Sequence, residues 1–182
     1  MRHALPTLLV LLLLAAPAGA QIYNGFFEIP GGAGWTVTQP TTGWLYFETS
    51  GGNPDGYATV RIAATGPVDV SCISQVFECG SEPGGVCNIS FDFSLLSEIF
   101  IVGGGEVRAY IDGVLSYVSA SIDQDWTTVE LAVPCGVHEI TLCLELSVPD
   151  EQYVACFDNV TAACDGGVPA ESLDWSTVKT LY

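Results

Sequence analysis

Apolar and polar residues alternate along most of the chain from Gln21 to Cys164. In Asn88–Leu95 every second residue from Ile89 onward is apolar, and Glu106–Ile111 and His138–Leu146 show the same period of two. Because successive side chains of a strand point to opposite faces of a sheet, this period predicts half-buried β-strands. No convincing helical period occurs in this part of the sequence.

Further strands are expected where apolar runs lie between breaks rich in Gly and Pro. These strands are Ile22–Glu28, Leu45–Glu48, Tyr57–Ala63, Val68–Glu78, Val114–Val118 and Tyr153–Ala163. The dipeptide Asp112-Gly113 is typical of a two-residue hairpin turn, so it is expected to join the strands on either side of it. Many short strands separated by turns predict an all-β sandwich or barrel.

The two ends of the chain depart from this pattern. A short apolar run, Leu8–Ala15, lies between a weakly basic start and a small-residue cleavage site at Ala18–Ala20. We therefore expect residues 1–20 to be a secretory signal peptide, with a retained N-terminal anchor as the alternative. No later segment is long and apolar enough for a membrane helix. Residues 21–164 are expected to form one domain, and residues 165–182 a linker with a short helical or disordered tail.

The charge balance excludes several classes of partner. The chain carries 21 Asp and Glu against 4 Lys and Arg, a formal net charge of −17. Such a chain should repel nucleic acid and anionic lipid, and it has few cations for binding phosphate. An acidic surface suits calcium or an extracellular setting.

The chain contains seven cysteines. In an exported protein they favour disulfides, and zinc is the weaker alternative because no Cys-x-x-Cys pair occurs. The expected bridges are Cys79–Cys87 at the base of a loop, Cys143–Cys156 in successive strands, and Cys135–Cys164 at strand ends. Cys72 would then be a thiol, either buried and inert or paired with another chain. Spacing alone does not determine the connectivity.

The sequence offers little support for catalysis. His138, which follows a Gly turn, is the one histidine outside the signal segment and is expected to be structural. Neither a Gly-x-Ser-x-Gly nor a His-Glu-x-x-His motif occurs. Acidic residues are so abundant that no single carboxylate pair stands out, so we expect no enzyme, with a jelly-roll glycosidase or lyase as the alternative.

Motifs at both ends of the domain resemble a known family. The segment Tyr23–Glu28 (Tyr-Asn-Gly-Phe-Phe-Glu) precedes Gly34-Trp35, and Trp126–Val133, Gly136–Leu144 and then Phe157–Val160 (Phe-Asp-Asn-Val) close the domain. This order resembles bacterial carbohydrate-binding modules of the galactose-binding-like jelly-roll type, which accompany cellulases and xylanases. The resemblance implies a two-sheet antiparallel jelly-roll sandwich, with a concave outer sheet face that cradles a glycan chain.

The resemblance also implies a structural calcium. The positions that match its ligands are Glu28 and Asp158, and the glycine-rich Ser50–Gly56 adds backbone carbonyls and the side chains of Asn53 and Asp55. Calcium binds several oxygens of these kinds. The alternative is that the two carboxylates only accept hydrogen bonds from backbone groups.

Candidate ligand contacts combine aromatic rings, which stack on sugars, with polar groups. Arg108 and Tyr110 alternate with apolar neighbours and so point outward; Asp92 is expected to face the same way from a neighbouring strand. Trp44 and Tyr46, two apart, share one face. The resemblance places Trp35 and Trp126 in the core.

These observations predict a secreted, non-catalytic domain that binds an extracellular glycan weakly on one sheet face and holds a structural calcium. The alternative is a structural or adhesive surface protein without a sugar ligand, in which the acidic surface and the odd cysteine serve assembly. No nucleic-acid partner and no membrane span are expected.

Overall fold

The structure, a computed structural model, describes residues 22–53, 56–63, 68–80, 83–98 and 104–165. The predicted signal peptide and C-terminal tail lie outside these residues. The described part contains ten strands. They are β1 (Thr36–Thr38), β2 (Gly43–Glu48), β3 (Tyr57–Ala63), β4 (Asp69–Cys79), β5 (Val86–Ser97), β6 (Gly105–Ile111), β7 (Val114–Val118), β8 (Gln124–Pro134), β9 (Gly136–Leu146) and β10 (Gln152–Asp165).

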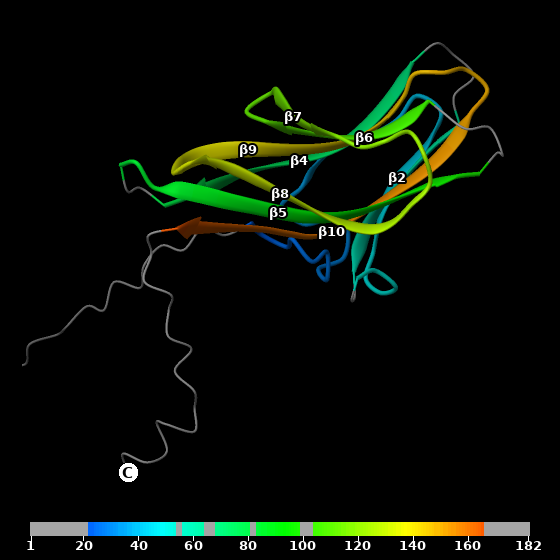
Figure 1. Cartoon of the computed structure of the whole chain (residues 1–182). Coiled ribbons are helices and arrows are strands. Elements are labelled where there is room, and N and C mark those ends of the chain that lie inside the picture. The colour runs from blue at the N-terminus through cyan, green and yellow to red at the C-terminus, as the bar shows by residue number, and fades with distance from the viewer. Residues whose placement is uncertain (1–21, 54–55, 64–67, 81–82, 99–103, 166–182) are drawn as a thin grey trace, which may run out of the picture.

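The strands form two antiparallel sheets of five strands each, as the sequence predicted for a jelly-roll sandwich. The first sheet has the order β1-β4-β9-β6-β7, and the second has the order β2-β3-β10-β5-β8. Figure 1 shows the two layers, with β7 and β9 in one and β5 and β10 in the other. None of the described residues forms a helix long and apolar enough to cross a membrane.

The core lies between the two sheets and is built by the alternation seen in the sequence. The apolar residues of β5, from Ile89 to Leu95, are at most 1% exposed. They meet inward-facing residues of β9 and β10, including Leu142 and Phe157, both fully buried. Each of these strands therefore has one buried face and one outer face, and the two outer faces are the surfaces available for binding.

One predicted strand is wrong. Residues Ile22–Glu28 form turns and irregular structure, and the positive φ angles of Asn24 and Phe27, 53° and 51°, lie outside the extended region of a regular strand. Phe27 is nevertheless fully buried, with its ring centroid 5.3 Å from that of Trp35. The predicted core position of Trp35 is confirmed, since this indole is 8% exposed.

The hairpin between β6 and β7 follows the predicted turn. Asp112 and Gly113 both have positive φ angles, 52° and 75°, as a two-residue turn of the primed type requires. Asp112 also accepts hydrogen bonds from the neighbouring β9, and this ties the turn to the sheet.

Candidate functional site

The predicted ligand contacts lie on two opposite faces. Arg108 and Tyr110 belong to β6 and point outward from the first sheet. The guanidinium of Arg108 forms ion pairs within the first sheet: it donates to the carboxylates of Glu106 and Glu145, each at 2.9 Å. These carboxylates raise the pKa of Arg108.

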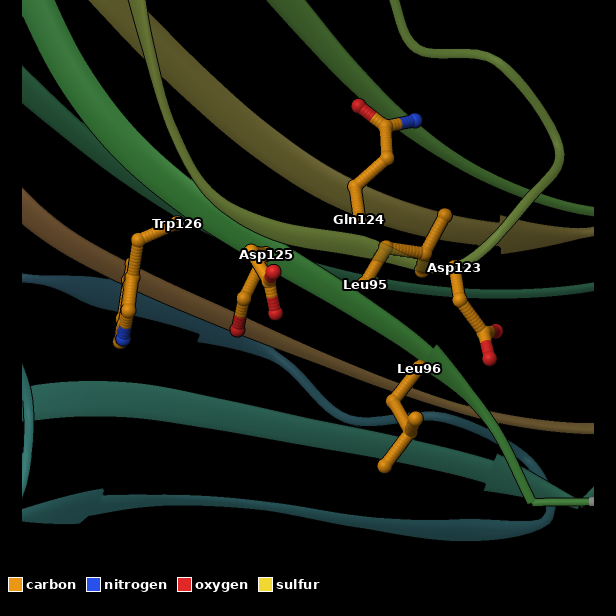
Figure 2. Close-up of a pocket in the computed structure, with 7 residues that line it drawn as sticks. Leu95, Leu96, Asp123, Gln124, Asp125 and Trp126 are labelled. Atoms are coloured by element: carbon orange, nitrogen blue, oxygen red, sulfur yellow. The ribbon is translucent and has the colours of Figure 1, made fainter.

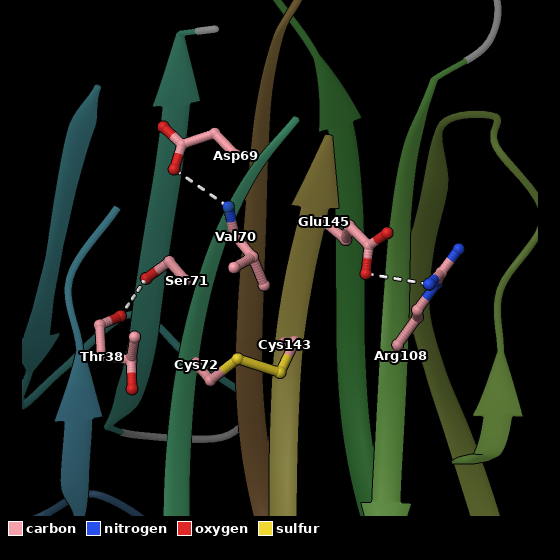
Figure 3. Close-up of a disulfide and its surroundings, with 8 residues drawn as sticks. All are labelled: Thr38, Asp69, Val70, Ser71, Cys72, Arg108, Cys143 and Glu145. Carbon is pink, nitrogen blue, oxygen red and sulfur yellow. Dashed lines mark hydrogen bonds and ion pairs between the residues drawn. A yellow bond between two sulfur atoms is a disulfide. The ribbon is translucent and has the colours of Figure 1, made fainter. Parts of the chain in front are cut away.

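A disulfide occupies the middle of the same outer face. Cys72 and Cys143 stand directly opposite each other on β4 and β9, and the structure joins them (Figure 3). The predicted Cys143–Cys156 bridge and the predicted thiol at Cys72 are therefore wrong. Cys156 lies on β10 in the other sheet, and its side chain points to the opposite outer face of the sandwich.

Asp92 does not share a face with Arg108, so that prediction is wrong as well. It belongs to β5, in the second sheet, and is only 6% exposed. Its carboxylate accepts hydrogen bonds from the Thr128 hydroxyl at 2.6 Å and from the side-chain amides of Asn53 and Asn159. Asp92 therefore anchors the segment around Asn53 to the sheet.

The predicted calcium ligands are partly brought together. Asp158 stands opposite Asp92 and is fully buried; its carboxylate accepts the backbone N–H groups of Asn53 at 2.6 Å and of Asn159 at 2.7 Å. Asp55 lies outside the described residues. Glu28 is exposed, and in the described part of the chain no group of three or more acidic side chains with closely spaced oxygens includes it.

The outer face of the second sheet carries the other aromatic candidates. Trp44 and Tyr46 lie on β2, at the edge of the sheet, and their ring centroids are 4.4 Å apart. Tyr46 is 42% exposed. Next to Trp44 on β3, Arg61 donates to Glu98 at 2.6 Å and to Gln152 at 2.7 Å. The prediction that the two aromatic side chains share a face matches this arrangement.

A pocket opens at the opposite edge of the second sheet, where β5 and β8 meet. Its volume is about 390 Å³, and it is lined by Ser94, Leu95, Leu96, Asp123, Gln124, Asp125 and Trp126. Figure 2 shows that Trp126, Asp125 and Leu96 extend to the same side of the strands. Asp123 accepts the backbone N–H of Ser97 at 2.7 Å, which fixes that wall of the pocket.

A β-bulge explains why Asp125 and Trp126 point the same way although they are consecutive. On β5 the pairing advances two residues, from Phe93 to Leu95, while on β8 it moves three residues, from Thr127 to Gln124. Alternation from Thr127, which pairs with inward-facing Phe93, places Trp126 on the outer face, and the extra residue adds the Asp125 side chain beside it. Trp126 is therefore half-buried in a pocket wall rather than in the core, and its predicted core position is wrong.

Four cysteines meet at one end of the sandwich. Cys79 is bonded to Cys87, the pair expected at the base of the loop, and the sulfur of Cys164 lies 3.0 Å from that of Cys79. All seven cysteines are described, and the structure has no Cys135–Cys164 bond. A Cβ added at Gly80 would lie 2.7 Å from the Cys164 sulfur and 3.7 Å from that of Cys135, so both sulfurs lie close to this position.

His138 has both ring nitrogens engaged. One nitrogen is 2.8 Å from a carboxylate oxygen of Asp112, and the other is 2.7 Å from the carbonyl oxygen of Pro134. Burial lowers the pKa of His138, but these two hydrogen bonds raise it more, and the net shift is upward. The imidazole is thus held as a structural link between the β6–β7 turn and β9.

Comparison with solved structures places the fold. The chain is similar to TmCBM61, which was solved in complex with β-1,4-galactotriose. The two share 14% sequence identity with a TM-score of 0.55, and the match covers 79% of this chain and 96% of that chain. It is also similar to the enzymatically active domain of tailspike protein 4 of bacteriophage CBA120, with 13% sequence identity and a TM-score of 0.55. That match covers 79% of this chain but 21% of the tailspike chain. No protein-family model and no curated protein sequence matches the chain.

At these identities the likeness concerns the fold alone. The predicted resemblance is confirmed at that level: the chain is a β-sandwich of the kind found in carbohydrate-binding modules. Because the same sandwich fold occurs in proteins of several functions, binding has to be inferred from the residues of the site and not from the fold.

Proposed function

We propose that this protein is a secreted, non-catalytic glycan-binding domain whose sugar contact lies in the pocket at Trp126. The observation that carries the proposal is the combination of a half-buried indole with carboxylate groups on one outward-facing wall. An indole offers a flat apolar surface to the C–H face of a pyranose, while Asp125 and Asp123 supply acceptors for hydroxyl groups. An open pocket of this kind gives modest affinity, on the order of micromolar to millimolar.

Charge narrows the class of glycan. With a formal net charge of −17 and acidic side chains in the pocket wall, the protein would repel uronic-acid polymers. The ligand is therefore an uncharged polysaccharide. Because the similar TmCBM61 was solved with β-1,4-galactotriose, β-1,4-galactan is the first polymer to try.

The test is binding of the full secreted chain to a panel of neutral and anionic polysaccharides. Trp126→Ala is expected to weaken binding to the best polymer at least tenfold, about 1.4 kcal/mol, with an unchanged melting temperature. Tyr110→Ala, on the opposite outer face, tests the other predicted site. Loss of binding in Tyr110→Ala with retention in Trp126→Ala would move the site to the first sheet.

Secretion and lack of catalysis complete the proposal. The apolar segment and cleavage site within residues 1–20 support export, and two disulfides fit an extracellular location. The engaged imidazole of His138 supports a structural rather than a general-base role. Steady release of reducing sugar from the bound polymer would contradict the non-catalytic assignment. Binding to none of the panel would instead favour a structural or adhesive surface protein.

Calcium is proposed at the cluster of Asp92, Asp158 and Asn53. Two buried carboxylates face each other there, and the side-chain amide of Asn159 contacts both the Asn53 carbonyl oxygen and Asp92. Rotation of that amide and of the Asn53 side-chain amide by half a turn would bring their oxygens to these acceptors, giving the oxygen ligands that calcium prefers. When bound, calcium would neutralise the two carboxylates and stabilise the loop.

Thermal unfolding with calcium and with a chelator tests this site. If calcium binds, chelation lowers the melting temperature of the wild type but not that of Asp92→Asn. An identical melting temperature under both conditions would mean that hydrogen bonds alone satisfy the cluster.

A further inference from the structure

The cysteines at one end of the sandwich bring a disulfide and two thiols together. Cys79 ends β4 in the first sheet, and it is bonded to Cys87 at the start of β5 in the second sheet. Cys164 stands directly opposite Cys87, on the last turn of pairing between β10 and β5. Cys135 follows β8 and donates its backbone N–H to the carbonyl oxygen of Gly85, just before β5 begins. Strands from both sheets therefore deliver sulfur atoms to one place.

Cys164 is placed to react with the disulfide. Its sulfur is 3.0 Å from that of Cys79, and it takes part in neither disulfide of the structure. Gly80 permits this approach, because a Cβ at that position would lie only 2.7 Å from the Cys164 sulfur. Two reacting groups held in contact react within one molecule and need no encounter in solution, which speeds the reaction greatly.

The surroundings favour this internal reaction over attack from solution. Cys79 and Cys87 are fully buried, so their bond is shielded from dissolved thiols. Cys164 is partly exposed, so its thiol can lose a proton to water. A small thiol that carries negative charge is also repelled by a chain with a formal net charge of −17.

We propose that Cys79, Cys87 and Cys164 form a thiol–disulfide exchange site in which Cys164 is the nucleophile. The Cys164 thiol gives its proton to water, and its thiolate attacks the Cys79 sulfur. A Cys79–Cys164 bond forms while the Cys79–Cys87 bond breaks, and the Cys87 thiolate leaves with the electron pair and takes up a proton. One disulfide and one thiol are present before and after, so the exchange needs no oxidant or reductant.

The exchange changes which part of the chain the bond closes. Cys79 and Cys87 are 8 residues apart, whereas Cys79 and Cys164 are 85 residues apart. A bond over the longer separation restricts the unfolded chain more, and it joins β10, the last strand, to the first sheet. The site lies at the other end of β8 from Trp126, so it is separate from the proposed glycan pocket.

The test maps the bonds of the full chain, purified without reductant and incubated at about pH 8, where thiols exchange. Excess maleimide then blocks the thiols, and peptides made with pepsin in acid are identified by mass spectrometry. At least about a tenth of Cys79 is expected to be bonded to Cys164, with an equal amount of blocked Cys87. Cys156→Ser, which removes a cysteine outside both disulfides, is the control and should leave this distribution unchanged.

Three variants separate a reacting thiol from one that is merely close. In Cys87→Ser, Cys79 is expected to bond to Cys164. In Cys164→Ser, Cys79 should be bonded to Cys87 alone, and no blocked Cys87 should appear. Gly80→Ala keeps every cysteine and should reduce the Cys79–Cys164 fraction, because its Cβ displaces the Cys164 sulfur.

Two results for the wild type would overturn the proposal. One is Cys79 bonded only to Cys87 after incubation, with Cys164 blocked by the maleimide. The other is a bond between Cys135 and Cys164, which would leave Cys164 without a thiol for the attack. A folded Cys87→Ser chain in which Cys79 is not bonded to Cys164 would also contradict it, and if this variant does not fold, the wild-type map decides.

Discussion

The disulfide between Cys72 and Cys143 offers a direct test of the strand pairing in the first sheet. Replacing both residues with Ala removes the bond without leaving a thiol behind. The two cysteines are 71 residues apart in sequence and are adjacent only because β4 and β9 pair. The bond therefore closes a long loop in the unfolded chain, and its removal should destabilise the fold mainly by giving that chain more freedom.

The size of the effect follows from the loop. For a separation of 71 residues, the chain-entropy relation gives about 15 cal/mol/K, or about 4 kcal/mol at 25 °C. Residual structure in the unfolded chain makes this value an upper figure for the entropic part. The space that Ala leaves unfilled at Cys143, which is 3% exposed, adds to the loss. Against a typical total stability of about 5–15 kcal/mol, such a loss is easily measured.

Urea unfolding followed by tryptophan fluorescence, under non-reducing conditions, measures the free energy of unfolding of the double variant and the wild type. Cys156→Ala is the matched control, since this residue takes part in neither disulfide, and its replacement should cost under about 1 kcal/mol. A double variant within about 1 kcal/mol of wild type would refute the Cys72–Cys143 bond. A loss in Cys156→Ala as large as that in the double variant would instead favour a Cys143–Cys156 bond.

Three further substitutions test single contacts. His138→Gln should lower the melting temperature more at about pH 5.5 than at about pH 8.5. In the folded protein the pKa of His138 lies above its ordinary 6.5, and the pKa of Asp112 lies below its ordinary 3.8. Their ion pair is therefore complete between pH 3.8 and 6.5, and its stabilisation is lost as the pH rises through the folded pKa of His138. Gly105→Ala should cost about 1–3 kcal/mol in urea unfolding, because the new Cβ would lie 2.4 Å from the buried ring of Tyr153. Asp69→Asn should cost a similar amount, because its carboxylate accepts three backbone N–H groups and an amide NH₂ would oppose one or more of them.

Alternation along the sequence predicted which face of a strand is buried, because that depends only on neighbouring residues. The inward positions of β5, Ile89 to Leu95, are buried as expected, and the expected bounds of β3 and β7 match those observed. Alternation carries no information on which strands pair, since pairing depends on contacts distant in sequence. For that reason alternation led to two wrong predictions, Arg108 and Asp92 on one surface and a bond between Cys143 and Cys156, although each pair is split between the two sheets.

The candidate site shows the same limit at the level of one residue. Trp44 and Tyr46 could be assigned to a common face because β2 keeps a regular period of two. The resemblance placed Trp126 in the core, although alternation with Thr127 and Val129 places it on the outer face. Only the bulge that brings Asp125 beside it depends on the register between β5 and β8, and this register leaves no mark in the sequence of β8 alone. Deletion of Asp125 should therefore restore regular pairing and leave Trp126 on the outer face opposite Ser94, so that glycan binding weakens less than it does in Trp126→Ala.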